Sequence, residues 1–259
     1  MSEPVVVERH AGLVTIRLNR PDVLNALNQP MADGLLAAVR AVEHDRSARA
    51  ILLTGAGRSF MAGGDISLFS GEGATARIDR LMRTLHTTIE LLAALPLPVV
   101  ALAHGTVAGA GVSTALAADV VLAADDAKFV LAYSRLGASP DGGSTYQLPR
   151  ALGLRRALGF ALLEETMDAA EALRVGLVNR LLPAGSVQED ALKIAERLAA
   201  GPTAAFGRTK ALLRASLDRD LPGQLDAERA NFLGGTFGAD FAEGVAAFLG
   251  KRRPAFNGE

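Results

Sequence analysis

Asp141 is the acidic residue whose sequence neighbours most suggest chemistry. It lies in the stretch SPDGGS (residues 139–144), between Pro140 and two glycines. A carboxylate in a loop that lines a pocket can remove a proton from one atom of a ligand and return it to another. The same residue types form a strong turn sequence, and an aspartate at this place readily caps a following helix. The stretch by itself leaves a catalytic and a structural interpretation open.

Two glycine-rich loops offer backbone amides for binding negative charge. They read LTGAGRSFMAGGDI (53–66) and LAHGTVAGAGVSTALAAD (102–119), and each follows an apolar run and leads into a predicted helix. Small residues let a ligand approach unpaired N–H groups at a helix start. The N–H groups of Gly64 and Ala110 would form an oxyanion hole if they faced one thioester oxygen. The alternative is that the glycines only form turns and close contacts, since neither loop is a P-loop or a dinucleotide fingerprint.

Alternating helices and strands must position these loops. The pattern predicts a hairpin over residues 5–19 and then a repeating order of helix and strand, with the second helix stopped by Pro96 and Pro98. Parallel strands need crossover helices, so the order indicates an α/β fold with sheets covered by helices. The helices are expected at 31–44, 78–95 and 110–118, and the strands at 49–55, 99–103 and 120–124.

After Pro183 the strand patterns cease, and helices are predicted at about 186–200, 203–217, 223–232 and 240–251. We therefore expect two parts, a core of residues 1–198 and a C-terminal helical region of residues 199–259. This region carries Phe232, Phe237, Phe241 and Phe248, which is more apolar than a free tail. It is expected to pack on its own core or on another subunit.

Composition limits the classes of partner. The chain has 27 Lys and Arg against 28 Asp and Glu, which disfavours binding to nucleic acid or to an anionic membrane. It has no cysteine, which excludes disulfides and thiolate catalysis, and no His and acidic cluster with metal-ligand spacing. Its start carries charges where a signal peptide needs an apolar core. We expect a cytoplasmic protein without a metal.

Four further polar residues favour structural roles. His104 stands at a strand end and is expected to pack or to form a hydrogen bond, and His86 is expected on a helix face. Asp65 should cap a helix. Asp119 lies between a helix and an apolar strand and should be buried and hydrogen-bonded.

Several motifs resemble those of the crotonase, or enoyl-CoA hydratase/isomerase, superfamily. They are NRPDVLNALN (19–28), GAGRSFMAGGDI (55–66), HGTVAGAGVSTALAADVVLAADDAKF (104–129), EALRVGLVNRLLP (171–183) and the closing FAEGVAAFLGKRRPAF (241–256). The resemblance implies a spiral of ββα units, a C-terminal helical region used in trimerisation, and a homotrimer or dimer of trimers. It implies acyl-CoA thioesters as ligands and no separate cofactor, since coenzyme A is part of the substrate.

The resemblance also implies roles for individual residues. The two oxyanion donors fall on the N–H groups of Gly64 and Ala110, and contacts to coenzyme A fall in two segments and at a C-terminal lysine. These contacts are Arg20, Val23 and Leu24, then Ala62, Asp65 and Ile66, and finally Lys251 reaching a neighbouring subunit. The run KRR that contains Lys251 is otherwise a solvated helix end.

The sequence departs from the hydratases of the superfamily at both catalytic glutamates. The motifs place these glutamates at Ser113 and Tyr133, where hydroxyl groups are poorly suited to activating water. Both residues are predicted to line the substrate site. The stretch around Asp141 resembles single-aspartate isomerases of the superfamily, such as 1,2-epoxyphenylacetyl-CoA isomerases. One carboxylate is enough to move a double bond through a thioester enolate, so an acyl-CoA isomerase is the leading hypothesis.

Three alternatives remain. The first is an enoyl-CoA hydratase with an unusual arrangement for activating water. The second is an aryl-CoA dehalogenase, which is disfavoured because its pocket tryptophan has no counterpart in a chain without tryptophan. The third is a superfamily member that binds acyl-CoA without turnover.

Overall fold

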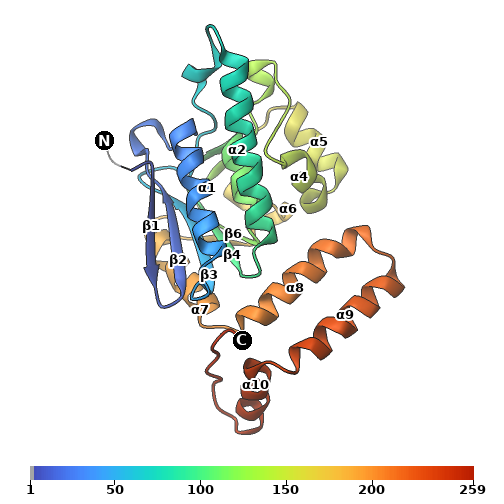
Figure 1. The fold of residues 1–259 in the computed structure, drawn as a ribbon. Coiled ribbons are helices and arrows are strands. Elements are labelled where there is room, and N and C mark those ends of the chain that lie inside the picture. Colours follow the sequence, from blue (N-terminus) through green and yellow to red (C-terminus); the bar gives the residue numbers. More distant parts are fainter. Residues whose placement is uncertain (1–2) are drawn as a thin grey trace.

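A six-stranded sheet forms the centre of the computed structural model, which describes residues 3–259 (Figure 1). The strand order is β1-β2-β3-β4-β6-β9, and only the β1–β2 pair is antiparallel. Ala11 and Gly12 connect β1 and β2 with φ angles of 47° and 83°, which is the backbone twist that a two-residue hairpin turn requires. The strands are β1 Val5–His10, β2 Leu13–Leu18, β3 Ala50–Gly55, β4 Val99–Ala103, β6 Val120–Ala124 and β9 Arg180–Leu182.

A second, smaller sheet gives the fold its spiral. Its strands β5 (Thr106–Ala108), β7 (Lys128–Val130) and β8 (Met167–Asp168) pair in that order. β5 follows β4 in the chain and β7 follows β6, so each turn contributes a strand to one sheet and then to the other. An isolated bridge between Met61 and Val107 adds the loop after β3 to this second sheet. The predicted α/β spiral of ββα units is confirmed.

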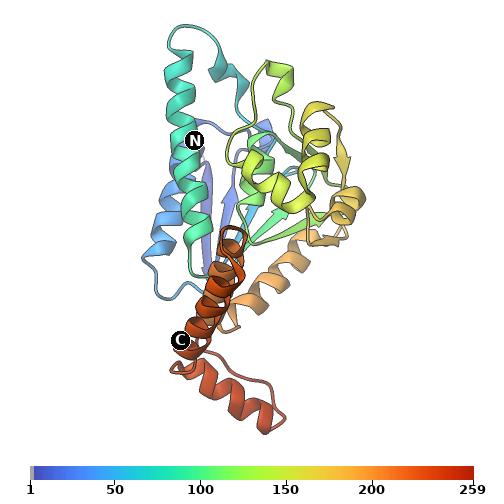
Figure 2. The same ribbon diagram turned by 90° about the vertical axis from the view of Figure 1, so that its right-hand side faces the viewer.

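Helices cover both faces of the large sheet. In Figure 2 its strands lie between α1 and α2 on one side and α7 on the other. α1 packs on β1, β2 and α2, whereas α7 packs on β2, β3, β4, β6 and β9. All six residues of β3 are buried, as expected for a strand covered on both faces. The helices of the core are α1 Gln29–Glu43, α2 Ala74–Ala94, α3 Ala110–Leu116, α4 Ser144–Leu152, α5 Leu154–Leu162, α6 Ala169–Val175 and α7 Val187–Ala199.

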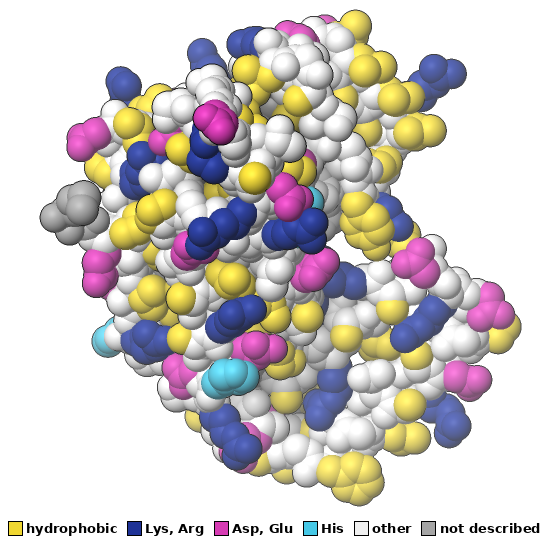
Figure 3. Space-filling model, turned by 45° about the horizontal axis from the view of Figure 1, so that its top comes forward, with side chains coloured by type: hydrophobic (Ala, Val, Ile, Leu, Met, Phe, Trp, Pro, Cys, Tyr) yellow, Lys and Arg dark blue, Asp and Glu magenta, His cyan; other side chains and the backbone are white. Residues whose placement is uncertain are grey.

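The last three helices extend away from the core (Figures 1 and 2). They are α8 Thr203–Ala215, α9 Leu221–Gly235 and α10 Ala239–Leu249. Apolar residues of these helices line a groove of about 920 Å³, and Phe248 at its edge is 84% exposed. Figure 3 shows hydrophobic side chains on both sides of the notch between these helices and the rest of the molecule. The boundary between residues 198 and 199 stays a prediction.

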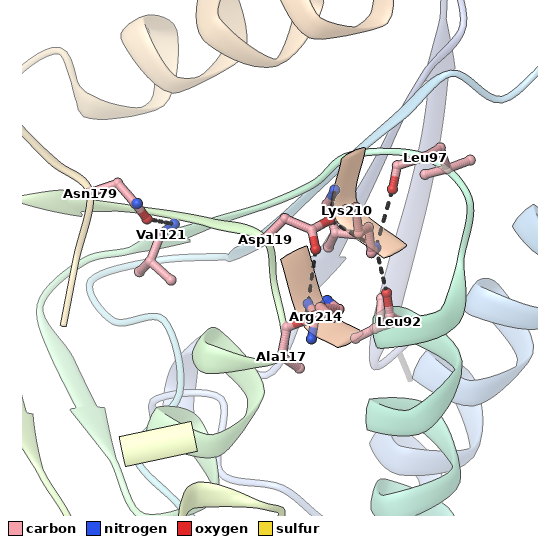
Figure 4. A network of polar contacts seen from close by, with 9 residues as sticks. Leu92, Leu97, Ala117, Asp119, Val121, Asn179, Lys210 and Arg214 are labelled. Atoms are coloured by element: carbon pink, nitrogen blue, oxygen red, sulfur yellow. Dashed lines mark hydrogen bonds and ion pairs between the residues drawn. The ribbon is translucent and has the colours of Figure 1, made fainter. Parts of the chain in front are cut away.

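A buried polar network attaches α8 to the core (Figure 4). Asp119 accepts hydrogen bonds from the backbone N–H of Val99, at 2.9 Å, and from Arg214, also at 2.9 Å. The Lys210 amine lies 2.8 Å from the same carboxylate and donates to the carbonyl oxygens of Leu92 and Leu97. The hydrogen bonds predicted for Asp119 are confirmed, but its side chain is 18% exposed and so only partly buried. Among residues 3–259, no helix combines the length and apolarity needed to cross a membrane.

Candidate active site

The two glycine-rich loops lie against each other. The N–H of Ala108 donates to the carbonyl oxygen of Met61 at 2.9 Å, and the loops share the bridge between Met61 and Val107. Gly109 has φ 49° and ψ −117°, and a Cβ placed on it would lie 3.7 Å from the Cα of Gly63. A side chain at Gly109 would be strained and would fill the space between the loops. These glycines therefore bring two backbone segments into close approach.

The amides of Gly64 and Ala110 both remain available at this junction. Leu27 pairs with Gly64 in an isolated bridge, but the bonds of that bridge involve the Gly63 carbonyl and the Asp65 amide. Ala110 is the first residue of α3. Within residues 3–259, neither the Gly64 nor the Ala110 N–H donates a hydrogen bond to another protein group. Two unpaired amides in adjacent loops meet one requirement of the predicted oxyanion hole.

The carboxylate of Asp141 accepts a hydrogen bond from the phenol of Tyr133. Tyr133 precedes the short 3-10 helix Ser134–Leu136, and its Cζ atom would lie 3.8 Å from a Cβ placed on Gly109. The Tyr133 ring thus connects the carboxylate to the loop that carries Ala110. Burial, followed by the charge of Asp141, raises the pKa of the Tyr133 phenol. The phenol therefore stays protonated and acts as a donor.

Asp141 does not cap the helix that follows it. The N-cap residue of α4 is Gly143, and no side chain bonds to the first turn. The backbone does form the turn, because Gly142 and Gly143 have φ angles of 59° and 77° and the Ser144 N–H donates to the Asp141 carbonyl. The turn interpretation holds for the backbone, and the capping interpretation of the carboxylate is wrong.

Ser113 and His86 hold the loop that carries Asp141. The Ser113 hydroxyl donates to the Asp141 carbonyl oxygen at 2.8 Å, and Ser113 is completely buried. The Ser113 hydroxyl thus bonds to the protein backbone, and the predicted contact of Ser113 with the substrate stays a prediction. His86, expected only as a helix-face residue, accepts a hydrogen bond at Nε2 from the Gly142 N–H at 3.4 Å. His86 lies 56 positions before Gly142, so no local sequence signal indicated this contact.

The two predicted coenzyme A segments lie side by side. The Ala62 N–H donates to the Leu24 carbonyl at 3.0 Å, and Arg20 pairs with Asp65 at 3.2 Å. Asp65 also caps the 3-10 helix Ile66–Phe69 by accepting from the Ser67 N–H, as predicted. These hydrogen bonds, first that of the Ser67 hydroxyl, lower the pKa of Asp65. Arg20 therefore has a structural partner within the chain.

Two apolar residues of these segments are exposed beside the glycine loops. Val23 is 46% exposed and Ile66 is 52% exposed. Leu24 adopts a left-handed conformation with φ 52°, which turns the chain between Val23 and the first glycine loop. Exposed apolar side chains next to unpaired amides can contact a ligand without losing an internal contact.

Lys251 lies apart from the other predicted site residues. It follows α10 in the helical region, and its backbone N–H donates to Phe248. Its neighbour Arg252 is used in a two-bond pair with Glu243. Within one chain the structure does not bring Lys251 to the glycine loops, and its contact to a neighbouring subunit stays a prediction. Among the described residues, no group of three His, Cys, Asp or Glu is arranged to hold a metal ion.

Comparison with known proteins assigns the chain to a family. The family model described as enoyl-CoA hydratase/isomerase matches residues 8–259. A Rhodobacter capsulatus protein named a probable enoyl-CoA hydratase is 43% identical over 250 residues, 95% of each chain. The 1,2-epoxyphenylacetyl-CoA isomerase of Escherichia coli K12 is 38% identical over 262 residues, 100% of each chain. The crystal structure of an enoyl-CoA hydratase from Polaromonas sp. JS666 is 33% identical, with a TM-score of 0.91 over 98% of this chain and 99% of that chain. The protein therefore belongs to the enoyl-CoA hydratase/isomerase, or crotonase, family.

Proposed function

We propose that this protein is an acyl-CoA isomerase that shifts a double bond, or rearranges a ring-derived acyl group, through a thioester enolate. One observation carries the proposal. The residues at the two hydratase glutamate positions are Ser113 and Tyr133, and the hydroxyls of both form hydrogen bonds to Asp141. The side chains that replace the glutamates thus support a single carboxylate. That carboxylate is half-buried and has no capping role.

The reaction requires one base and one stabilised oxygen. The Asp141 carboxylate removes a proton from a carbon next to the double bond, and the electron pair moves onto the thioester oxygen. The amides of Gly64 and Ala110 stabilise the negative charge that develops there. The protonated Asp141 then returns its proton to a different carbon, and the thioester carbonyl forms again. Tyr133 orients the carboxylate throughout, because its phenol remains a donor.

Hydration makes different demands on the site. One group must deprotonate water, and another must deliver a proton to the α-carbon. The hydratases that this sequence resembles use two carboxylates for these steps. With hydroxyls at both positions, the arrangement favours proton transfer by Asp141 alone. Relatives of this chain carry both hydratase and isomerase names, so an atypical hydratase and a non-catalytic acyl-CoA-binding protein are the rival functions.

The proposed ligand is an acyl-CoA thioester, with coenzyme A bound beside the paired segments of Leu24 and Ala62. No separate cofactor is needed, because the thioester itself stabilises the carbanion. The exposed phenylalanines of α9 and α10 further support a homotrimer, in which another copy covers the apolar groove. Light scattering of the purified protein would test this assembly.

A substrate panel tests the proposed function. Purified protein would be incubated with 2-enoyl-CoA, 3-enoyl-CoA and 1,2-epoxyphenylacetyl-CoA, alongside the variants Asp141→Asn and Asp226→Asn. Asp226 is exposed on α9 and serves as the matched control. We expect isomerisation that falls by roughly 10²- to 10⁴-fold in Asp141→Asn only, because a general base is lost. Affinity for the thioester should survive.

Two results would contradict the proposal. Rapid hydration of crotonyl-CoA that does not depend on Asp141 would favour the hydratase. Tight binding of every thioester without turnover would favour the non-catalytic alternative.

A further inference from the structure

The peptide unit between Asp141 and Gly142 is held from two helices at once. Its carbonyl oxygen accepts the Ser113 hydroxyl of α3 at 2.8 Å. Its N–H donates to Nε2 of His86 on α2 at 3.4 Å. The two bonds act on opposite ends of one peptide plane, so together they limit its rotation. The side chain of Asp141 is attached to the Cα atom at the start of this peptide plane.

Packing leaves the peptide little room to move. A Cβ placed on Gly142 would lie 2.7 Å from the Cβ of Ser113 and 3.4 Å from Cδ1 of Ile89. Ile89 is on α2, three positions after His86, so both helices press on the same glycine. With φ 59°, the backbone here also disfavours any residue with a side chain. The loop of Asp141 therefore depends on contacts from α2 and α3 that are specific to Gly142.

The hydrogen bond requires one particular tautomer of the His86 imidazole. A backbone N–H can only donate, so Nε2 of His86 must carry a lone pair and the proton must lie on Nδ1. In this form His86 accepts the hydrogen bond of the Gly142 N–H, so both polar groups of the peptide have a partner. Gly142 is buried, and its N–H has no other acceptor among residues 3–259. Loss of the imidazole acceptor would leave a buried donor unsatisfied, which favours rotation of the peptide.

We propose that His86 is a positioning residue for Asp141. By accepting the Gly142 N–H, it holds the loop so that the Asp141 carboxylate keeps the orientation set by Tyr133. This inference rests on the proposed function, because the orientation of Asp141 matters for turnover only if Asp141 moves the proton. Proton transfer depends steeply on the position of the base, so a small rotation of this peptide lowers kcat without removing the ligand contacts.

Two substitutions of the same chemical type test the proposal. In His86→Gln the side-chain amide oxygen can reach the place of Nε2, whereas in His86→Asn the amide is one methylene shorter and does not reach Gly142. His44→Asn is the control, since His44 is an exposed residue that ends α1. We expect kcat to fall roughly tenfold in His86→Asn and to stay within about threefold in His86→Gln, with KM nearly constant. Both variants are assayed well below their thermal midpoints, so that kcat reports on the folded protein.

Amide hydrogen exchange at Gly142 supplies a readout that does not need turnover. We expect exchange that is at least roughly tenfold faster in His86→Asn than in the wild type, and close to the wild-type rate in His86→Gln. Equal exchange in all three proteins would overturn the hydrogen bond to His86. Equal kcat in both variants, or a loss that follows thermal stability, would overturn the positioning role. A wild type that exchanges as expected but shows no isomerisation would instead overturn the proposed function.

Discussion

The phenol of Tyr133 donates a hydrogen bond to the carboxylate of Asp141, eight positions further along the chain. The two residues approach because the 3-10 helix Ser134–Leu136 and a left-handed Gly137 turn the chain back on itself. Tyr133 also packs on Gly109, beside the Ala110 amide. One side chain thereby contacts both the carboxylate proposed to transfer the proton and the loop that carries the proposed oxyanion donor, Ala110.

Tyr133→Phe should reduce turnover and leave ligand affinity nearly unchanged. The substitution keeps the ring against Gly109 and removes only the donor that orients Asp141. We expect kcat to fall roughly tenfold, which steady-state kinetics would measure. Because the pKa of Tyr133 is raised, the wild-type rate should show no decline from phenol ionisation up to about pH 10. A wild-type rate that falls above pH 9 and no longer does so in Tyr133→Phe would contradict the assignment.

Ser113→Glu should not convert the enzyme into a hydratase. Ser113 is buried and packs directly against Gly142. A longer side chain at position 113 must therefore displace the loop of Asp141. We expect isomerisation to fall at least roughly tenfold and hydration of crotonyl-CoA to remain undetected. Ser113→Ala is the matched control and should lose less than about threefold, since Ser144 still donates to the Asp141 carbonyl. Rapid hydration by Ser113→Glu would show that the loop does not exclude a carboxylate.

Lys210→Met should destabilise the fold and leave the site chemistry intact. The substitution removes the amine from a buried network in which burial already lowers the pKa of Lys210. Asp119 keeps its hydrogen bond from Arg214, but the carbonyl oxygens of Leu92 and Leu97 lose the hydrogen-bond donor that Lys210 supplies. We expect the free energy of unfolding to fall by about 2–4 kcal/mol, measured by urea denaturation. Lys193→Met, at an exposed position of α7, should have almost no effect, and equal effects of the two substitutions would contradict the role of the network.

The protein should lose stability as pH falls below 6.5, and His104 should contribute to this loss. His104 is 6% exposed, its Nε2 lies 3.2 Å from the Gly57 carbonyl, and burial lowers its pKa from 6.5. Between the folded pKa and 6.5 the unfolded chain binds more protons than the folded chain, so stability rises with pH. In urea denaturation between pH 5 and 8, we expect His104→Gln to flatten this dependence by at most about 1.4 kcal/mol per pH unit. An unchanged slope would show that His104 takes up its proton in the folded state.

Much of the fold was predictable because its signals are local. The strands β3, β4 and β6 and the helices α1, α7, α8 and α10 begin within about two residues of the predicted positions. Apolar periodicity, prolines and glycines mark these boundaries in the sequence itself. The strands β5, β7 and β8 were missed, because runs of two or three residues are too short to show a period. α2 begins at Ala74, four residues before the predicted start.

The candidate site divides in the same way. The glycine loops, the cap at Asp65, the hydrogen-bonded Asp119 and the place of Asp141 in a turn were evident from the sequence, since each depends on residue type and near neighbours. The tertiary structure added that Asp141 leaves its helix uncapped, that Ser113 bonds to the loop of Asp141, and that His86 takes part. These contacts join residues 28 and 56 positions apart. The packing of α2 and α3 against one glycine creates them, and no stretch of sequence contains both partners.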